Sequence, residues 1–177
     1  MLVIRMGYKL LTKKKMDLDN FKNSSKTEFA SNKKLVKKLR NIKPKVLDQI
    51  FSVAHDEAFR KINCLECANC CKTTSPIFLQ TDIDRLSRVF RMKSTDFMDR
   101  YLHRDGEGNF VLNSSPCPFL KSDNTCLVYE SRPKACREYP HTNRKNMHGI
   151  LNLTLKNSLI CPAVNEIFQD FGKDFRK

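Results

Sequence analysis

The chain has 177 residues with a formal net charge of +14, eight cysteines and no tryptophan. This length suits a single domain with an additional segment. Residues 1–45 carry 14 Lys and Arg against 3 Asp and Glu, whereas residues 46–177 carry 19 against 16, so the charge belongs mainly to the N-terminal part. No stretch approaches the roughly 18 apolar residues of a transmembrane helix, which argues against a membrane-spanning protein.

Residues 1–45 contain lysine runs separated by Asn and Ser. This composition offers little apolar surface to bury and predicts a flexible or weakly helical basic arm. Residues 1–15 lack the uninterrupted apolar run and the small-residue cleavage site of a secretory signal. We therefore expect a cytoplasmic protein whose thiols stay reduced, with a secreted domain held by disulfides as the alternative.

Residues 46–177 predict a small, mainly helical α+β domain with irregular cysteine-rich loops and short strands. Apolar residues recur at helical spacing over residues 46–62 and predict a helix that leads to the first cysteine. Thr81 resembles the N-cap of a second helix, with a carboxylate three residues later as in a capping box. A further short helix is expected from Ser94 or Thr95.

Short strands and two more helices follow along the chain. A turn rich in Gly and Asp precedes a predicted strand at residues 110–112, and another short strand is expected at residues 126–129. A short helix is expected to carry Cys136. Weak alternation of apolar residues predicts a strand over residues 150–156, and Pro162 is suited to the first position of a final helix.

The most informative feature of the chain is a CxxCxxCC run completed by four later cysteines. The full set is Cys64, Cys67, Cys70, Cys71, Cys117, Cys126, Cys136 and Cys161. Thiols two residues apart can converge on one metal centre, because each gap is long enough to turn the chain back. This density of thiols predicts a metal-binding domain, in which bound metal stabilises loops that have few apolar residues.

Two kinds of metal site agree with the spacing. Structural zinc sites use four thiolates, usually as two separated pairs with short internal gaps. Ferredoxin-type iron–sulfur ligation uses a CxxCxxC run plus a remote Cys followed by Pro, and both Cys117 and Cys161 precede a proline. The spacing therefore favours iron, as an iron–sulfur cluster, with zinc as the alternative. His141 and His148 are further candidate ligands, although the thiols already supply enough donors.

The adjacent cysteines carry a second inference. Neighbouring side chains tend to point apart, so we expect Cys70 and Cys71 to face different centres, or one of them to be a supporting or reactive thiol. Eight thiols suit two sites of four ligands each. Arg132 and Arg137 lie close to cysteines in sequence, and we expect them to favour thiolates and donate hydrogen bonds to sulfur. Solvated surface charges are the alternative interpretation.

These segments together resemble the YkgJ-type cysteine-cluster family, a zinc- or iron-chelating domain with the CxxCxxCC signature. The likeness spans about residues 46–170 and is carried by residues 64–71, 117–120, 126–129, 132–140 and 161–162. It implies a bacterial, cytoplasmic protein whose cysteines chelate iron or zinc, and family members are often described as iron–sulfur oxidoreductases. A related cysteine cluster occurs in flagellin lysine methylases, but this chain has no glycine-rich loop for S-adenosylmethionine.

Three functions follow from these observations. An iron–sulfur protein would have a redox or electron-transfer role with a protein redox partner. A zinc-stabilised binding module would use its basic arm to contact nucleic acid or an acidic protein, but the arm has few aromatic residues for base stacking. A catalyst with an open metal position or a free thiol is the third, yet no P-loop, HExxH or GxGxxG motif identifies a substrate.

Overall fold

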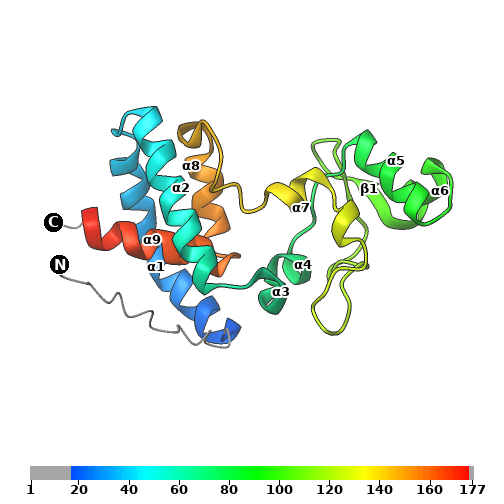
Figure 1. Ribbon diagram of the computed structural model, residues 1–177, viewed down its shortest axis with the longest axis horizontal. Helices are drawn as coiled ribbons and strands as arrows, with labels where there is room; N and C mark the ends of the chain where they lie inside the picture. Colours follow the sequence, from blue (N-terminus) through cyan, green and yellow to red (C-terminus); the bar gives the residue numbers. More distant parts are fainter. Residues whose placement is uncertain (1–16, 176–177) are drawn as a thin grey trace, which may run out of the picture.

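The computed structural model describes residues 17–175. Its helices are α1 (Leu18–Leu39), α2 (Pro44–Lys61), α3 (Cys64–Cys67), α4 (Asn69–Thr73), α5 (Gln80–Val89), α6 (Ser94–Tyr101), α7 (Lys134–Glu138), α8 (Met147–Asn157), α9 (Pro162–Phe175) and the 3₁₀ helix η1 (Tyr129–Ser131), and its strands are β1 (Leu102–Arg104) and β2 (Phe110–Leu112). The predicted α+β, mainly helical class is confirmed. Figure 1 shows two lobes joined by a narrow waist around α3, α4 and α7.

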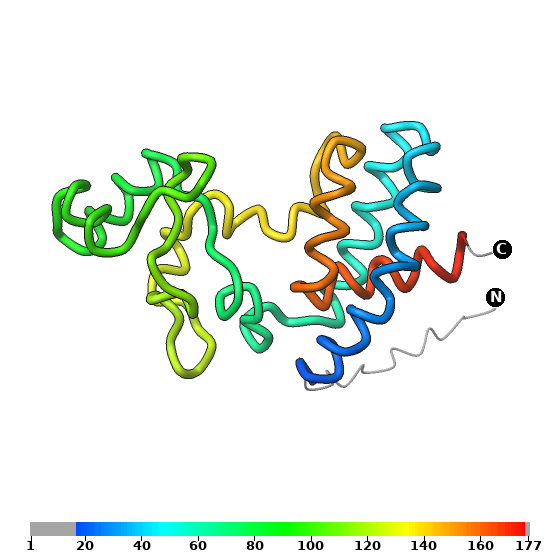
Figure 2. The backbone as a smooth tube through the Cα atoms, turned by 180° about the vertical axis from the view of Figure 1, so that it is seen from behind, coloured from blue at the N-terminus to red at the C-terminus, as the bar shows by residue number. Residues whose placement is uncertain are grey.

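The first lobe, here called the helical lobe, consists of α1, α2, α8 and α9, which come from both ends of the described chain (Figures 1 and 2). Both α8 and α9 pack against α1 and α2. The core between them contains fully buried side chains such as Leu39, Leu47, Phe51, Leu151 and Phe168. Pro162 starts α9 as predicted. Among residues 17–175, no helix combines the length and apolar character needed to cross a membrane.

Helix α1 changes the interpretation of the basic N-terminal region. The sequence predicts a flexible or weakly helical arm over residues 1–45, but residues 18–39 form a 22-residue helix that packs on α8 and α9. The reason is a buried face at helical spacing between the exposed lysines, formed by Phe21, Leu35, Val36 and Leu39. Residues 1–15, considered above for a secretory signal, lie outside the described residues.

The second lobe contains α5, α6, η1 and the two-stranded sheet. The strands pair antiparallel with Leu102 opposite Leu112, so the predicted strand at residues 110–112 is confirmed. An aromatic core has ring centroids 5.0 to 6.2 Å apart and is formed by Phe90, Phe97, Tyr101 and Phe119. The cores of the two lobes share no residue. Within the described part of the chain, no element of one lobe packs extensively against the other.

The predicted strand over residues 150–156 is wrong, because this stretch lies in α8. Met147, Leu151 and Leu155 are buried at four-residue intervals and share one face of the helix. Leu153, which an alternating strand would place with them, is 44% exposed. Packing of the four-residue repeat against α1 and α2 decides in favour of the helix.

Two smaller predictions also differ from the structure. Residues 126–129 form no strand: Cys126 makes an isolated bridge with Leu120, and η1 begins shortly afterwards. The N-cap of α5 is Leu79 rather than Thr81. The short predicted helix that carries Cys136 is present as α7.

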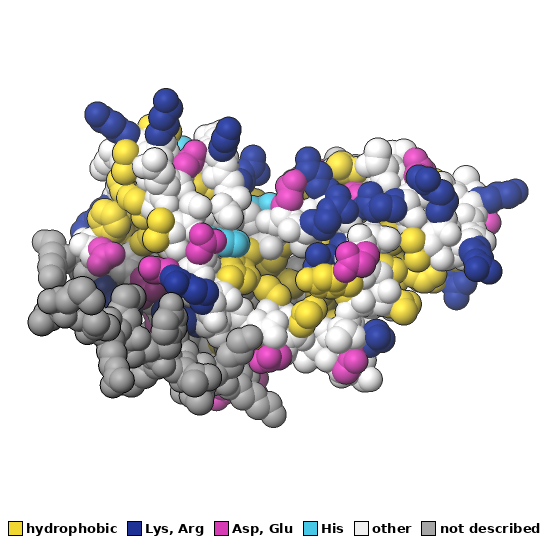
Figure 3. Space-filling model, viewed as in Figure 1, with side chains coloured by type: hydrophobic (Ala, Val, Ile, Leu, Met, Phe, Trp, Pro, Cys, Tyr) yellow, Lys and Arg dark blue, Asp and Glu magenta, His cyan; other side chains and the backbone are white. Residues whose placement is uncertain are grey.

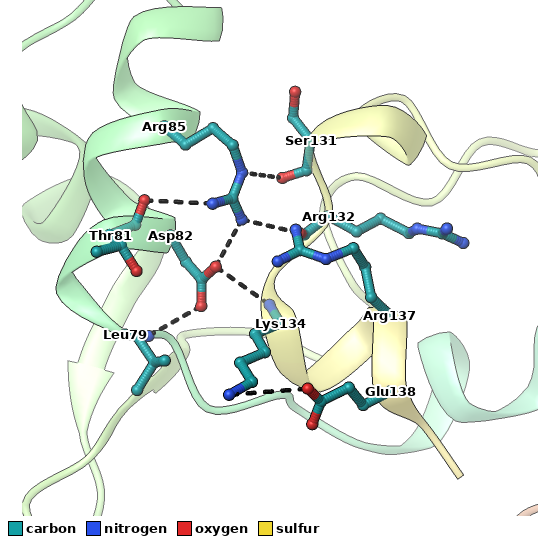
Figure 4. Close-up of polar contacts among 9 residues, drawn as sticks. All are labelled: Leu79, Thr81, Asp82, Arg85, Ser131, Arg132, Lys134, Arg137 and Glu138. Atoms are coloured by element: carbon teal, nitrogen blue, oxygen red, sulfur yellow. Dashed lines mark hydrogen bonds and ion pairs between the residues drawn. The ribbon is translucent and has the colours of Figure 1, made fainter. Parts of the chain in front are cut away.

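Asp82 explains where α5 starts (Figure 4). Its side chain is 1% exposed and accepts hydrogen bonds from the backbone N–H of Leu79 at 3.1 Å, from the Arg85 guanidinium, and from the backbone N–H of Lys134 at 3.1 Å. The first bond satisfies an N–H group that has no acceptor within the helix. The last bond ties α5 to α7, which lies more than fifty residues away in the sequence.

Arg85 extends this network to the loop before α7. Its guanidinium donates to the carbonyl oxygens of Ser131 at 3.2 Å and Arg132 at 2.9 Å (Figure 4). Because the same segment carries Cys136, the Asp82–Arg85 pair positions one predicted metal ligand and one predicted supporting arginine.

Candidate metal centre

The eight predicted ligands reach the waist on four segments of the chain. Helices α3 and α4 carry the CxxCxxCC run, the loop after β2 carries Cys117 and Cys126, α7 carries Cys136, and Cys161 directly precedes α9. All eight lie within the described residues and are free thiols; Cys67 and Cys161 are buried, and the others are at least partly exposed. Figure 3 shows apolar side chains, with cysteine coloured among them, gathered over α3 and α4 at the waist.

A residue in the left-handed backbone conformation separates the two short helices that carry the CxxCxxCC run. Asn63 caps α3 by accepting a hydrogen bond from the backbone N–H of Leu65 at 3.1 Å. Ala68 then adopts φ 47° between α3 and α4, a conformation that costs a residue with a Cβ about 1–2 kcal/mol. As a result, Cys64 and Cys67 lie on one short helix, and the other two cysteines of the run lie on the next.

Helix α4 is tied to the helical lobe beside Cys161. The buried Asn69 side chain donates from Nδ2 to the carbonyl oxygen of Ile160 at 2.6 Å. Cys161 follows in the sequence, and its backbone N–H donates to the carbonyl oxygen of Asn157 at 2.8 Å. Cys70 and Cys161 therefore lie on neighbouring segments.

Helix α4 is also connected to the second lobe, through the carbonyl oxygens of Cys71 and Lys72. The backbone N–H of Cys117 donates to the carbonyl oxygen of Cys71 at 2.8 Å, and the Ser115 hydroxyl donates to the carbonyl oxygen of Lys72 at 2.9 Å. Cys126 joins this group through its isolated bridge with the segment that follows Cys117. These backbone contacts bring the segments of Cys117 and Cys126 next to Cys71 of α4.

Burial keeps several of these thiols protonated. Burial, together with the charges of Cys71, Cys117 and Cys126, raises the pKa of Cys136 to about 12. Burial is also the main reason that the pKa of Cys117 is raised to about 11 and that of Cys161 to about 12. A metal ion must displace these protons in order to bind the sulfur atoms.

Cys71 is the exception among the thiols. A hydrogen bond from the adjacent Cys70 side chain, supported by the positive charges of Arg132 and Lys72, lowers the pKa of Cys71 to about 7 despite partial burial. The same interaction raises the pKa of Cys70, so the pair holds one proton firmly and releases the other easily. Near neutral pH, Cys71 is the thiol that most readily supplies a thiolate.

The two predicted supporting arginines differ in what they contact. The Arg132 guanidinium lies 3.4 Å from the centroid of the Tyr129 ring, and its charge lowers the pKa of Cys71 and opposes the larger effect of burial on the pKa of Cys126. Its Nε is buried and has no hydrogen-bond partner among residues 17–175. Arg137 donates instead to the carbonyl oxygen of Arg132.

Tyr139 is a functional candidate that the sequence analysis missed. Its hydroxyl is buried and has no hydrogen-bond partner within the described part of the chain. Burial raises the pKa of Tyr139, and the charges of nearby cysteines raise it further; these are Cys161, Cys70, Cys67 and Cys64. Tyr139 lies within residues 132–140, which carry the family resemblance, but nothing there distinguishes it from an aromatic side chain that only fills a core.

The donor atoms fit zinc or iron, although they are not yet gathered around one point. Among residues 17–175, no three His, Cys, Asp or Glu side chains are arranged to hold a metal ion. The thiols are nevertheless free, and zinc and iron prefer sulfur ligands. The buried hydrogen-bond donors of Tyr139 and Arg132 lie beside these thiols. The His148 ring contacts the carbonyl oxygen of Ile42 at 2.9 Å instead.

Comparison with known proteins agrees with this chemistry. A family model described as "CxxCxxCC: Putative zinc- or iron-chelating domain" matches residues 63–161, which is more than half of the chain and includes all eight cysteines. No curated protein and no solved structure matches the chain.

Proposed function

Because the chain belongs to the CxxCxxCC family of zinc- or iron-chelating domains, we propose that its eight cysteines bind zinc or iron as thiolates and that the metal joins the two lobes. The observation that supports this proposal is that different parts of the fold supply the thiols. Cys161 comes from the helical lobe, Cys117 and Cys126 come from the loop that follows β2 of the second lobe, and Cys136 and the CxxCxxCC run lie at the waist between the lobes. Metal–thiolate bonds would hold together two lobes that share no core.

Of the two metals, we favour iron held as an iron–sulfur cluster, with a role in electron transfer to a protein redox partner. The donors are all sulfur, and a CxxCxxC run with a remote Cys-Pro pair is typical of this ligation. When bound, such a cluster would supply one-electron redox chemistry, whereas tetrathiolate zinc would supply a structural link only.

The side chains around the thiols would assist metal binding in distinct ways. Cys71 ionises near neutral pH and would provide the first thiolate. The charges of Arg132 and Lys72 stabilise that thiolate, and the buried donors of Arg132 and Tyr139 are available to hydrogen-bond to sulfur. Burial of Cys67 and Cys161 would keep water away from part of the site.

The test is metal and acid-labile sulfide analysis, with a visible spectrum, on protein purified without oxygen. We expect iron and sulfide in near-equal amounts; zinc without sulfide would keep the chelation proposal and refute the iron–sulfur version. His148→Gln serves as the control and should keep the full metal content, because its ring is bonded to the carbonyl oxygen of Ile42. Protein that takes up neither metal while its thiols remain titratable would refute the proposal.

A further inference from the structure

Helix α1 carries a row of exposed lysines along one side. The row consists of Lys22, Lys26, Lys33 and Lys37, which follow one another at intervals of four, seven and four residues. Because successive residues of a helix turn by about 100° around its axis, these intervals keep the four side chains within about 60° of one another. The row extends for about 22 Å along the helix, and we call it the lysine stripe.

The lysine stripe lies on the opposite side of α1 from its buried face. Phe21, Leu35 and Leu39 are buried, and at about 100° per residue they lie at least about 100° away from the stripe around the axis. Helices α8 and α9 pack against α1. Folding therefore uses the apolar side of α1 within the helical lobe and leaves the lysine stripe facing outward.

Little negative charge on α1 offsets the lysine stripe. Lys22 Nζ lies 3.6 Å from the carboxylate of Asp19, whereas the other three lysines of the stripe form no ion pair within residues 17–175. Glu28 is the second acidic residue of α1, and its carboxylate accepts hydrogen bonds from two side chains of α9. Glu28 is thus directed toward the helical lobe, and the stripe keeps most of its positive charge.

The chemistry of this surface fits phosphate better than it fits a protein or a membrane. Residues 18–39 expose no large apolar side chain. Protein interfaces are depleted in lysine and contain aromatic or other apolar side chains at their centre, and a helix that binds a membrane inserts an apolar face. The phosphates of a nucleic acid require only positive charge, and each strand of a duplex presents one for about every 3.4 Å of axis, so a row of about 22 Å can contact several.

The same surface favours a duplex over a single strand. Proteins that bind single strands stack the bases on exposed aromatic side chains. Phe21 and Phe29 are the aromatic residues of α1; the first is buried and the second is only partly exposed. The stripe can therefore contact the backbone but offers no platform for unpaired bases.

We infer that the lysine stripe of α1 binds the phosphate backbone of a nucleic-acid duplex without reading its base sequence. This inference goes beyond metal chelation and does not depend on it, because the stripe lies on the helical lobe and contains no cysteine. Affinity comes from the release of counterions when lysines neutralise phosphates, so it should depend steeply on salt and little on sequence.

The test is the binding of the full-length protein to fluorescently labelled DNA and RNA duplexes of about 20 base pairs, which are longer than the stripe. A variant that combines Lys26→Gln, Lys33→Gln and Lys37→Gln keeps good helix formers in α1. It should reduce the slope of log K against log salt concentration by about 2.7, or about 0.9 for each lysine. Between about 50 and about 200 mM salt, wild type should then lose about 40-fold more affinity than the variant does.

The matched control removes the same charge from exposed lysines elsewhere on the molecule, by combining Lys93→Gln, Lys121→Gln and Lys145→Gln. It should keep the slope of wild type. Binding of either duplex supports the inference, and the tighter one identifies the source of the phosphates. Far-UV circular dichroism checks that α1 stays folded, and the metal content of each variant, measured alongside, separates this inference from the chelation proposal.

Three results would overturn the inference. The first is a wild type that binds neither duplex at low salt. The second is an equal salt slope for the stripe variant and the control variant, which would show that the stripe has no special part in binding. The third is affinity for polyglutamate or for anionic lipid vesicles that equals the affinity for the duplexes, because the stripe would then act only as general positive charge.

Discussion

Replacing Asp82 by alanine would test whether one buried carboxylate holds α5 and α7 together. The carboxylate accepts hydrogen bonds from the backbone N–H groups of Leu79 and Lys134, each at 3.1 Å, and pairs with the Arg85 guanidinium. Lys134 begins α7, so the same substitution loosens the segment that carries Cys136. We therefore expect a loss of stability and a weaker hold on one predicted ligand.

The magnitude follows from the groups left without partners. Each of the two N–H groups would lose a part-buried hydrogen bond, which costs about 1–3 kcal/mol where the group is left unsatisfied. The Arg85 side chain is 31% exposed and keeps part of its hydration, so its lost ion pair adds less than a fully buried pair would. Together these effects should lower the free energy of unfolding by about 2–6 kcal/mol, a large part of the roughly 5–15 kcal/mol typical of a folded protein.

The assay is urea unfolding of the metal-free protein, followed by tyrosine fluorescence and circular dichroism. The chain has no tryptophan, and Tyr101 lies in the aromatic core of the second lobe, so its emission reports on the affected part. Asp99→Ala is the matched control, because this exposed aspartate of α6 should change stability by less than about 0.5 kcal/mol. A loss below about 1 kcal/mol for Asp82→Ala would show that the network is not what anchors α7.

Three further measurements address the waist. Tyr139→Phe removes a hydroxyl that has no hydrogen-bond partner among the described residues, so the free energy of unfolding of the metal-free protein should stay within about 1 kcal/mol of wild type. Metal affinity, measured against a competing chelator, should fall about 10- to 100-fold. Unchanged affinity would contradict the role of the hydroxyl. Asn69→Ala removes the bond to the Ile160 carbonyl oxygen and should cost about 1–3 kcal/mol in urea unfolding, whereas wild-type stability would show that this bond does not hold α4. Burial raises the pKa of Cys136 and Cys161 to about 12, so the metal-free protein should lose stability as the pH rises above about 8.5, where unfolded thiols ionise. Metal affinity should rise over the same range, because protons compete less with the metal for sulfur as their concentration falls. Unfolding curves and calorimetry check the two trends, and stability that rises with pH would contradict the first.

Several elements could be predicted from the sequence because their signals are local. Pro162 starts a helix by its own backbone geometry. The strand at residues 110–112 follows a turn, and the short helix around Cys136 follows a proline. The segments that carry the cysteines were likewise evident from spacing alone, since a thiol cluster is rare enough to stand out in any sequence.

The remaining features depend on contacts between distant segments. The stretch at residues 150–156 is compatible with both strand and helix, and only packing against α1 and α2 selects the helix. The many lysines of α1 make its apolar face difficult to recognise in the sequence, and this face is buried because α8 and α9 pack against it. In the same way, Tyr139 lies within residues 132–140, one of the segments that carry the family resemblance, but its position beside thiols on α3, on α4 and just before α9 depends on the fold.

The separation of the two cores indicates why a metal would matter for the whole molecule. The direct ties of α4 to the two lobes include the hydrogen bonds of Asn69, Ser115 and Cys117, and each such bond contributes only about 0.5–1.5 kcal/mol net. A structural zinc–thiolate site contributes about 10–16 kcal/mol of apparent binding free energy. Metal at the waist would therefore outweigh these ties and set the relative position of the lobes. On this argument, chelation by this chain is coupled to its tertiary structure, and loss of metal would release the lobes from one another before either lobe unfolds.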